Sequence, residues 1–229
     1  METLFNGYTL EIAPGTFPLS TDSIALADFV RLPRYKQILD LGSGCGTLGL
    51  LLCAKDPDCH VTGIELHTLS HEAAEDNIRR NKLDSRMKSI CADLRQIPSF
   101  LEPGSYSVCV SNPPYFSGGP ASQKNPNARR DDCCTSEDLF RSAAWALRYG
   151  GDFYLVHRPE KLAELCVCGS RHNLELKRLR LLHHKSSGDV SLILMQFRKG
   201  GKRGHTWEKI YLYEEDGTPS QAYRRLYHI

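Results

Sequence analysis

The stretch Asn-Pro-Pro-Tyr-Phe, residues 112–116, combines residue types that could hold a polar group in one fixed position. It follows directly on the apolar run 106–111, which is typical of a buried strand. Two prolines would disrupt a helix or a central strand, because proline lacks an N–H group and fixes φ. At a strand end they instead fix the direction of backbone carbonyls. The sequence therefore predicts rigid hydrogen-bond acceptors, Asn112 Oδ1 and the carbonyl of Pro113, beside the flat rings of Tyr115 and Phe116.

A glycine-rich turn lies earlier in the chain, in the pattern Asp-x-Gly-x-Gly-x-Gly over residues 40–46. Glycines let the backbone approach a ligand closely, and the start of the following helix presents free N–H groups. The dinucleotide fingerprint G-x-G-x-x-G requires glycine at position 47, where this chain has Thr47. The spacing is instead similar to motif I of class I S-adenosylmethionine-dependent methyltransferases. The alternative is a tight strand-to-helix turn that binds nothing.

Two acidic residues follow at the ends of later strands. Glu65 stands at the end of the run 60–66, where a carboxylate can accept hydrogen bonds from both hydroxyls of a ribose. Asp93 stands in the same place after the run 87–92, and in the resembled family an acid there meets the amino group of the cofactor adenine. The alternative for Asp93 is a helix cap, because a helix-like segment follows it.

The residues 112–115 resemble motif IV, N-P-P-[YF], of methyltransferases that act on amino groups of adenine, cytosine or glutamine amides. The lone pair of such a nitrogen is delocalised, so the nitrogen is a poor nucleophile. Two fixed acceptors, Asn112 Oδ1 and the Pro113 carbonyl, can each take one N–H and aim the lone pair at a methyl group. Pro114 keeps this turn rigid, Tyr115 offers a face for a flipped base, and Phe116 a second wall.

The elements that must position these residues alternate between short apolar runs and amphipathic segments. This pattern predicts an open α/β sheet of seven strands that is mostly parallel and ends in an antiparallel hairpin. The resemblance of motifs I and IV implies that this is the Rossmann-like class I methyltransferase fold. The expected strands are 36–41, 60–66, 87–92, 106–111, 151–157, 174–182 and 189–197. The expected helices are 20–30, 46–55, 68–82, 136–148 and 158–165. We expect one domain over 1–229, with a mobile loop at 117–135 and the tail 198–229 packed on the domain.

Composition narrows the class of protein further. With 229 residues and 41% hydrophobic content the chain can bury a sizeable core, and it has no run of the length that a membrane span or signal peptide requires. We therefore expect a cytoplasmic protein. Its nine cysteines lie mostly in apolar segments, without a C-x-x-C pair, which is typical of reduced thiols. Cys166 and Cys168, with His172 nearby, are too weak a pattern to predict a metal site.

Positive charge is concentrated between Arg171 and Arg203, where nine Lys and Arg face two acids. Within it, the segment 198–204 pairs four cations with three glycines. Backbone phosphates supply much of the affinity in nucleic-acid complexes, so we expect Lys199, Lys202 and Arg203 to hold an RNA backbone. The alternative is a solvated surface loop.

Three kinds of amine fit motif IV. Glutamine methyltransferases of release factors place a helical domain before motif I, whereas only 35 residues precede the first expected strand. DNA adenine methyltransferases need a target-recognition region larger than the loop 117–135. RNA remains, with small unstructured targets such as a tRNA loop.

Nearly the whole chain resembles the bacterial family of tRNA1(Val) adenosine-37 N6-methyltransferases. The resemblance is carried by the segments 20–29, 112–116, 147–165 and 212–227. Family members commonly have Ala-Arg-His-Glu after motif IV, whereas residues 128–131 here are Ala-Arg-Arg-Asp. Arg129 and Arg130 are expected to steady nucleotides beside the target adenine.

The resemblance implies S-adenosyl-L-methionine as cofactor, a tRNA substrate, and no metal; we slightly favour a monomer. Thr21 and Asp22 would close over the methionine end. The alternatives are a protein glutamine N5-methyltransferase and an inactive RNA-binding domain of the same fold. The expected catalytic residues are Asn112, Pro113, Pro114 and Tyr115. The expected cofactor-binding residues are Thr21, Asp22, Asp40, Gly42, Ser43, Gly44, Gly46, Glu65, Leu66, Asp93, Leu94 and Asn112. The expected RNA-contacting residues are Phe116, Arg129, Arg130, Lys199, Lys202 and Arg203.

Overall fold

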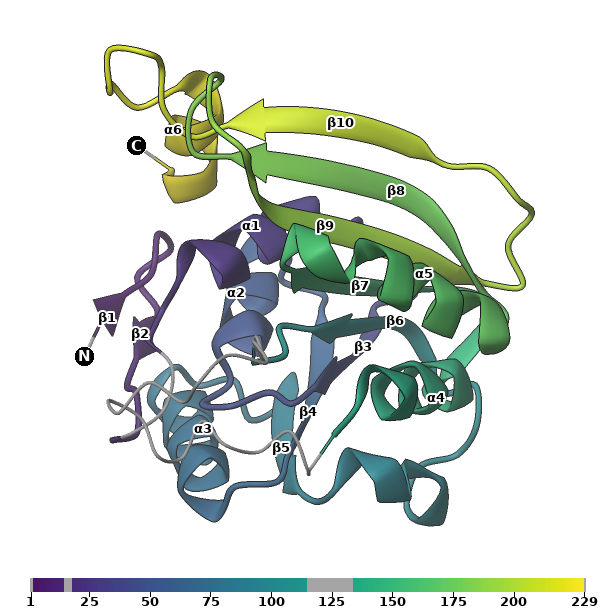
Figure 1. The fold of residues 1–229 in the computed structure, drawn as a ribbon. Coiled ribbons are helices and arrows are strands. Elements are labelled where there is room, and N and C mark those ends of the chain that lie inside the picture. The colour runs from purple at the N-terminus through teal and green to yellow at the C-terminus, as the bar shows by residue number, and fades with distance from the viewer. Residues whose placement is uncertain (1, 15–17, 115–133, 229) are drawn as a thin grey trace.

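The structure is a computed structural model that describes residues 2–14, 18–114 and 134–228. Within these residues the main sheet has eight strands in the order β10-β8-β9-β7-β6-β3-β4-β5 (Figure 1). Strands β3 to β7 run parallel, and β9 lies antiparallel between β7 and β8. The α/β class, the mostly parallel sheet and the antiparallel hairpin are confirmed. The strands are β3 (Gln37–Leu41), β4 (His60–Glu65), β5 (Met87–Cys91), β6 (Tyr106–Ser111), β7 (Leu147–His157), β8 (Leu174–His183), β9 (Val190–Lys199) and β10 (Thr206–Tyr211), with a separate pair β1 (Glu2–Thr3) and β2 (Thr9–Leu10).

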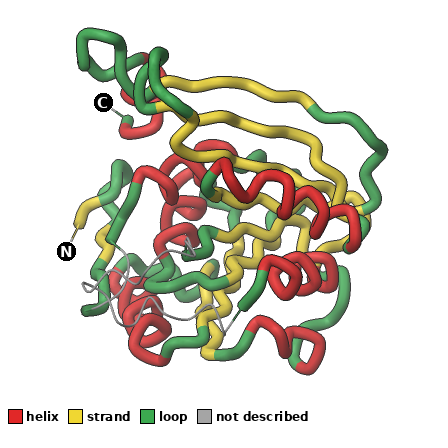
Figure 2. The backbone as a smooth tube through the Cα atoms, viewed as in Figure 1, coloured by secondary structure: helices red, strands yellow, loops and turns green. Residues whose placement is uncertain are grey.

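Helices lie on both faces of the sheet (Figure 2). One buried cluster joins the sheet to α1, α2 and α3, and the other joins it to η1, α4 and α5. The bounds are α1 (Thr21–Phe29), α2 (Thr47–Lys55), α3 (Thr68–Arg80), η1 (Leu94–Ser99), α4 (Ser136–Ala146), η3 (Pro159–Lys161), α5 (Leu162–Arg171) and α6 (Gln221–Tyr227). Within the described part of the chain, no helix has the length and apolar character that crossing a membrane requires.

Local capping explains where two helices begin. Ser20 is the N-cap of α1, and its hydroxyl accepts a hydrogen bond from the Ser23 N–H. Thr135 and Asp138 form a capping box at the start of α4, in which each side chain accepts from the other residue's backbone. This cap is the one that the sequence Thr-Ser-Glu-Asp predicts.

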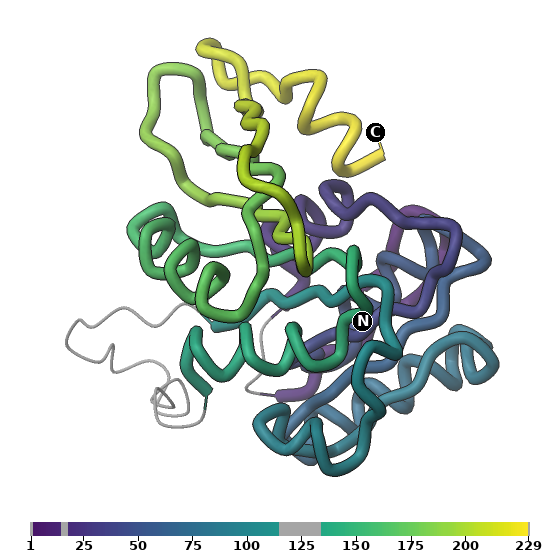
Figure 3. Tube along the Cα trace, turned by 90° about the vertical axis from the view of Figure 1, so that its right-hand side faces the viewer, coloured from purple at the N-terminus to yellow at the C-terminus, as the bar shows by residue number. Residues whose placement is uncertain are grey.

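Two elements at the C-terminal end differ from expectation. The main sheet has an eighth strand, β10, which pairs parallel with β8, so the expected hairpin is followed by another strand. Five of the six β10 residues are not buried, because an edge strand has a partner on one side only. Helix α6 then packs on the protein through buried Leu226. Figure 3 shows α6 beside α1, and a hydrogen bond of 2.7 Å between Thr21 Oγ1 and Tyr227 Oη joins the two helices.

The segment around Cys166 is also more helical than expected. Helix α5 continues to Arg171, so Cys166 and Cys168 both lie on it. Burial raises the pKa of both thiols. A search of the described residues finds no group of three His, Cys, Asp or Glu that could hold a metal ion.

Candidate functional site

The glycine-rich turn connects the end of β3 to the start of α2. Three glycines of the turn have positive φ angles: 73° at Gly42, 55° at Gly44 and 83° at Gly46. Residues with a side chain rarely adopt this backbone conformation. A Cβ at position 46 would lie 2.9 Å from Met87 Cε of β5 and 3.5 Å from Ala74 Cβ of α3. At Gly42 and Gly44, by contrast, no described atom lies within 4 Å of such a Cβ. The turn is therefore packed on its α3 side and open along Gly42 and Gly44.

Asp40, at the base of this turn, is a buried carboxylic acid without a partner. Its side chain is 1% exposed, and neither carboxylate oxygen has a hydrogen-bond partner among the described residues. The buried hydroxyl of Ser43 is in the same state. Burial, with a further contribution from the negative charge of Glu65, raises the pKa of Asp40 to about 8. A buried acid of this kind suits a ligand that brings N–H donors or positive charge.

Glu65 ends β4 and reaches across to the glycine-rich turn. One carboxylate oxygen accepts from the Gly44 N–H and the other from the His67 N–H, both over 2.8 Å. The structure thus brings Asp40, Gly44 and Glu65 together, as the sequence predicts. Leu66, the next residue, is 41% exposed and offers an apolar surface beside them.

Asp93 follows β5 at the same edge of the sheet and has partners within its own segment. It is the N-cap of η1, and its Oδ1 accepts from the backbone N–H of Arg95 over 2.9 Å. The Arg95 guanidinium also bonds to the carboxylate, and these bonds lower the pKa of Asp93. The helix-cap alternative is thus what the structure shows for Asp93. Leu94 packs against the cluster beneath α4, and its carbonyl accepts from Ser142 Oγ.

Asn112 follows β6 directly, at the edge where β3 and β4 also end. The Ser111 hydroxyl donates to the Leu41 carbonyl over 2.8 Å and ties these two strand ends together. The Asn112 side-chain amide donates from Nδ2 to Ser23 Oγ over 3.0 Å. Ser23 lies on α1 and is 6% exposed. This bond takes up the donor end of the amide, so the acceptor Oδ1 faces away from Ser23.

Ser23 is a residue of this site that motif spacing did not predict. The sequence does contain a signal for it, because Ser23 directly follows Thr21 and Asp22, both of which were expected to bind the cofactor. Thr21 bonds to Tyr227 of α6, and Asp22 lies in the first turn of α1. Pro113 is half-buried and Pro114 exposed. Four expected residues lie outside the described residues, namely Tyr115, Phe116, Arg129 and Arg130.

Lys199 does not lie near Asn112, because β9 runs antiparallel to β7. Arg198 pairs with Asp152 near the start of the β6–β7 pairing, whereas Ser111 pairs with Leu155 near its end. Lys199 Nζ donates to the carbonyls of Ala144 and Leu147, over 2.6 and 2.7 Å. Its ammonium thus ties the end of α4 to the sheet, and the expected contact of Lys199 with RNA stays a prediction. Lys202 and Arg203 follow and are exposed.

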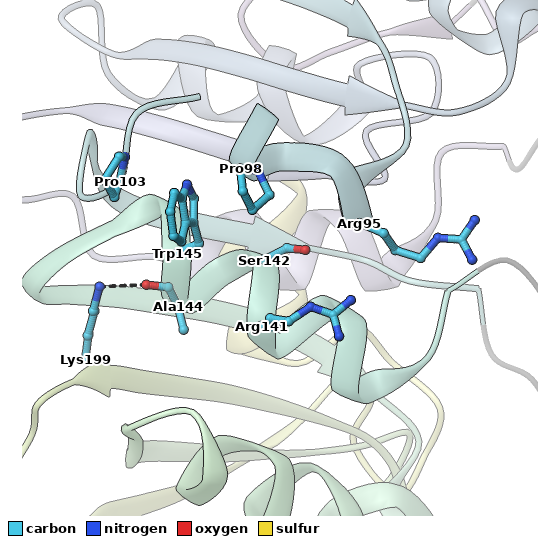
Figure 4. A pocket seen from close by; sticks show the side chains of 8 residues that line it. All are labelled: Arg95, Pro98, Pro103, Arg141, Ser142, Ala144, Trp145 and Lys199. Atoms are coloured by element: carbon cyan, nitrogen blue, oxygen red, sulfur yellow. Dashed lines mark hydrogen bonds between the residues drawn. The ribbon is translucent and has the colours of Figure 1, made fainter. Parts of the chain in front are cut away.

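A cavity of about 330 Å³ lies between η1 and α4, away from the glycine-rich turn (Figure 4). Its cations have partners: Arg95 binds Asp93, Arg141 binds Asp138, and Lys199 donates to the backbone. The cavity does not coincide with the edge that carries Asp40 and Asn112. Its lining residues are Arg95, Pro98, Pro103, Arg141, Ser142, Ala144, Trp145 and Lys199.

Comparison with known proteins gives a consistent family. Residues 19–167 match the model of the methyltransferase small domain. The chain is 29% identical over 222 residues to the tRNA1(Val) (adenine(37)-N6)-methyltransferase of Shewanella halifaxensis, covering 91% of this chain and 90% of that protein. It is 27% identical over 195 residues to the protein of the same name from Aliivibrio salmonicida, covering 84% and 82%.

Solved structures share the fold. A predicted O-methyltransferase from Agrobacterium tumefaciens superposes with a TM-score of 0.77 at 21% identity, covering 91% of this chain and 96% of that one. The 16S rRNA N2 G1207 methyltransferase of Thermus thermophilus, solved with its cofactor and guanosine, gives a TM-score of 0.57 at 22% identity, covering 82% and 45%. At these identities the likeness extends to the fold alone.

Proposed function

The chain belongs to the methyltransferase small domain family, and we propose that it methylates the exocyclic N6 of adenine 37 in tRNA1(Val) or a closely similar tRNA. It is an enzyme, and its cofactor is S-adenosyl-L-methionine, which supplies an electrophilic methyl group. Asn112 and the Pro113 carbonyl at the end of β6 are the observation that carries the proposal. Relatives that share most of their length with this chain are named for this reaction.

The residues around the glycine-rich turn fit this cofactor. Asp40 and Ser43 have buried polar atoms without partners among the described residues, and the ammonium group of a methionine moiety is a matching donor. Gly42 and Gly44 leave the open side on which a ligand can lie against the backbone. Glu65, already held by the Gly44 N–H, has lone pairs left for ribose hydroxyls. Leu66 would cover one face of the adenine ring.

The transfer step depends on how Asn112 is oriented. An exocyclic amine has two N–H groups, and Asn112 Oδ1 and the Pro113 carbonyl can each accept one. Accepting both aims the nitrogen lone pair away from the ring plane and toward the methyl group. The bond from Nδ2 to Ser23 Oγ keeps Oδ1, rather than the amide nitrogen, available to the substrate. Tyr115 and Phe116 follow in the sequence and remain our proposal for the stacking faces.

Asp93 has a narrower role in this proposal than the sequence suggested. Its carboxylate is occupied by Arg95 and caps η1, so any contact with the adenine amino group shares an oxygen that already accepts hydrogen bonds. Arg129 and Arg130 remain proposed contacts to the nucleotides beside the target. We also propose that the enzyme acts on its tRNA in the cytoplasm and as a monomer.

The experiment that tests this function uses tRNA that lacks the modification. The purified protein is incubated with radiolabelled cofactor and total unmodified tRNA, and the RNA is digested to nucleosides. We expect label in N6-methyladenosine. Label in a guanosine derivative, or in a release-factor protein offered in parallel, would replace this function by another amino-methylation.

A further inference from the structure

An exposed tryptophan lies on the outer strand of the sheet, well away from the core. Trp207, the second residue of β10, is 62% exposed. It pairs with Leu179 of β8, which belongs to the buried cluster beneath α4 and α5, so its side chain projects on that face. Lys209 follows on the same face, with its Nζ 5.9 Å from the centre of the indole ring. The ring is thus held near a cation with much of its surface open to solvent.

Positive charge accompanies this ring. Lys202, Arg203 and His205 lead into the strand and are exposed. Lys177 Nζ donates to the Lys202 carbonyl over 2.7 Å, which fastens the segment to β8. No ion pair joins Lys202, Arg203 or Lys209 to an acid of the described chain.

The acid nearest in sequence faces the other way. Glu208 alternates with Trp207 along β10, and its carboxylate accepts from Arg180 Nε over 2.8 Å on the α1 face. The face that carries Trp207 therefore has Lys209 beside the ring, and the exposed cations Lys202, Arg203 and His205 lie in the segment that enters the strand. An aromatic ring among cations is the composition of a surface that stacks unpaired bases and holds phosphates.

The register of the sheet relates this surface to the candidate active site. Trp207 pairs with Leu179, Leu179 with Met195, Met195 with Leu155, and Leu155 with Ser111. Trp207 therefore lies in the same row across the sheet as Ser111, the residue that directly precedes Asn112. Four strand spacings of about 4.8 Å separate the two, or about 19 Å along the sheet. One RNA molecule can span that distance.

We propose that Lys202, Arg203, His205, Trp207 and Lys209 form a second RNA contact, the β10 surface, on which a single-stranded segment of the substrate tRNA stacks a base against Trp207. This rests on the proposed function. The cations hold adjacent phosphates, and Lys209 adds a cation–π contact to the same ring. The surface anchors the tRNA while another of its nucleotides enters the site at Asn112. A second copy of the chain, paired along the open edge of β10, is the competing occupant.

The chain offers an internal control, because it has two tryptophans, Trp207 and Trp145. Trp145 lies on α4 and donates from Nε1 to the Leu101 carbonyl. Trp145→Phe leaves Trp207 as the sole tryptophan fluorophore, and Trp207→Phe leaves Trp145. Each full-length variant is titrated with an unmodified tRNA1(Val) transcript, while a filter-binding assay records tRNA binding independently.

We expect saturable quenching of Trp207 and unchanged emission from Trp145. Trp207→Ala should weaken tRNA binding roughly ten-fold and leave binding of S-adenosylhomocysteine unchanged. The double change Lys202→Gln with Arg203→Gln should reduce the slope of log affinity against log salt by about 0.7 for each phosphate that the protein no longer neutralises.

Each other result overturns the proposal in a distinguishable way. A transcript that is bound and methylated without altering Trp207 emission would leave the proposed function standing and remove the β10 surface. Failure of the wild-type protein to bind or methylate the transcript would remove both. A dimer in light scattering that Trp207→Ala dissociates would assign the strand edge to a second copy.

Discussion

The side-chain amide of Asn112 donates to the hydroxyl of Ser23 over 3.0 Å, across 89 residues of sequence. The bond joins the end of β6 to the first turns of α1. An asparagine amide can present either an oxygen or an NH₂ group to a ligand, and only the oxygen can accept an N–H from an amine. In the observed orientation the NH₂ end of Asn112 is bound to Ser23, which leaves the oxygen end for the substrate.

Removal of the acceptor should slow the transfer itself. Asn112→Ala is expected to lower kcat on tRNA by about 100-fold or more, because the missing hydrogen bond acts mainly in the transition state. Affinity for S-adenosylhomocysteine should change far less than kcat, although Asn112 is also among the expected cofactor contacts, and calorimetric titration measures it. Unchanged turnover in this variant would remove Asn112 from the mechanism.

Ser23 should act through Asn112 alone. Ser23→Ala is expected to lower kcat about ten-fold at unchanged KM, since the amide then samples both orientations, whereas Ser23→Thr keeps a hydroxyl and should retain more of the rate. In the Asn112→Ala background the same change should have no further effect, because residues that share one interaction are not additive. Additive effects in the double variant would mean that Ser23 supports the fold instead.

The buried carboxyl of Asp40 predicts a dependence of stability on pH. Its pKa rises from an ordinary 3.8 to about 8 in the folded protein, so between these values the folded state holds a proton that the unfolded state has released. The free energy of unfolding of the cofactor-free protein should therefore fall as pH rises from about 4 to about 8, and this contribution should level off above that. Urea unfolding at pH 5 and pH 8 measures it, with Asp40→Asn as the control that lacks the titration. If both proteins showed the same pH dependence, the carboxyl of Asp40 would not be holding a proton in the folded state.

Glu65 should affect cofactor binding more than turnover. Glu65→Ala is expected to weaken binding of S-adenosylhomocysteine with a smaller decrease of kcat at saturation, because ribose contacts are the same in ground and transition states. The variant should also be less stable to heat, since the Gly44 and His67 N–H groups no longer have their acceptor. Glu65→Gln retains one acceptor oxygen, so its cofactor affinity and heat stability should lie between those of the wild type and of Glu65→Ala. Wild-type affinity in the alanine variant would argue that the carboxylate serves only the turn.

A substitution at Lys199 should lower the stability of the fold without changing RNA binding. Lys199→Gln is expected to cost about 1–2 kcal/mol of unfolding free energy, because its ammonium bonds two carbonyls near the C-terminal end of α4. Its salt dependence of tRNA binding should match that of the wild type. A smaller slope of log tRNA affinity against log salt, with unchanged stability, would show that Lys199 contacts the RNA.

Much of the fold could be predicted because its central strands β3, β4 and β6 are almost wholly buried and form continuous apolar runs, whereas β5 lies at the edge of the sheet and has one buried residue. The runs 36–41, 60–66, 87–92 and 106–111 differ from the observed strands by at most one residue at either end. Strand β10 escaped prediction because an edge strand of alternating polar residues carries little hydrophobic signal. Its parallel pairing with β8 depends on tertiary contacts that local periodicity does not contain.

In the candidate site, too, the sequence predicts some residues, whereas others depend on tertiary contacts. Strand ends locate Asp40, Glu65 and Asn112, because the carboxyl ends of parallel strands meet at one edge of the sheet. Ser23 and the cap role of Asp93 depend on side-chain orientation, which spacing does not specify. The position of Lys199 relative to Asn112 could not be predicted from a basic run alone, because it depends on the antiparallel course of β9, which carries Lys199 to the opposite edge of the sheet.

The most direct measurement maps the methyl group on a defined tRNA. Transcripts of tRNA1(Val) with adenosine 37, and with guanosine in its place, are methylated side by side and then analysed by nuclease digestion and mass spectrometry. The proposed mechanism predicts N6-methyladenosine at position 37 of the first transcript, no methylation of the second, and no product from Asn112→Ala above about one hundredth of the wild-type rate. Methylation of the guanosine transcript, or a methyl group at another atom of the first, would contradict it.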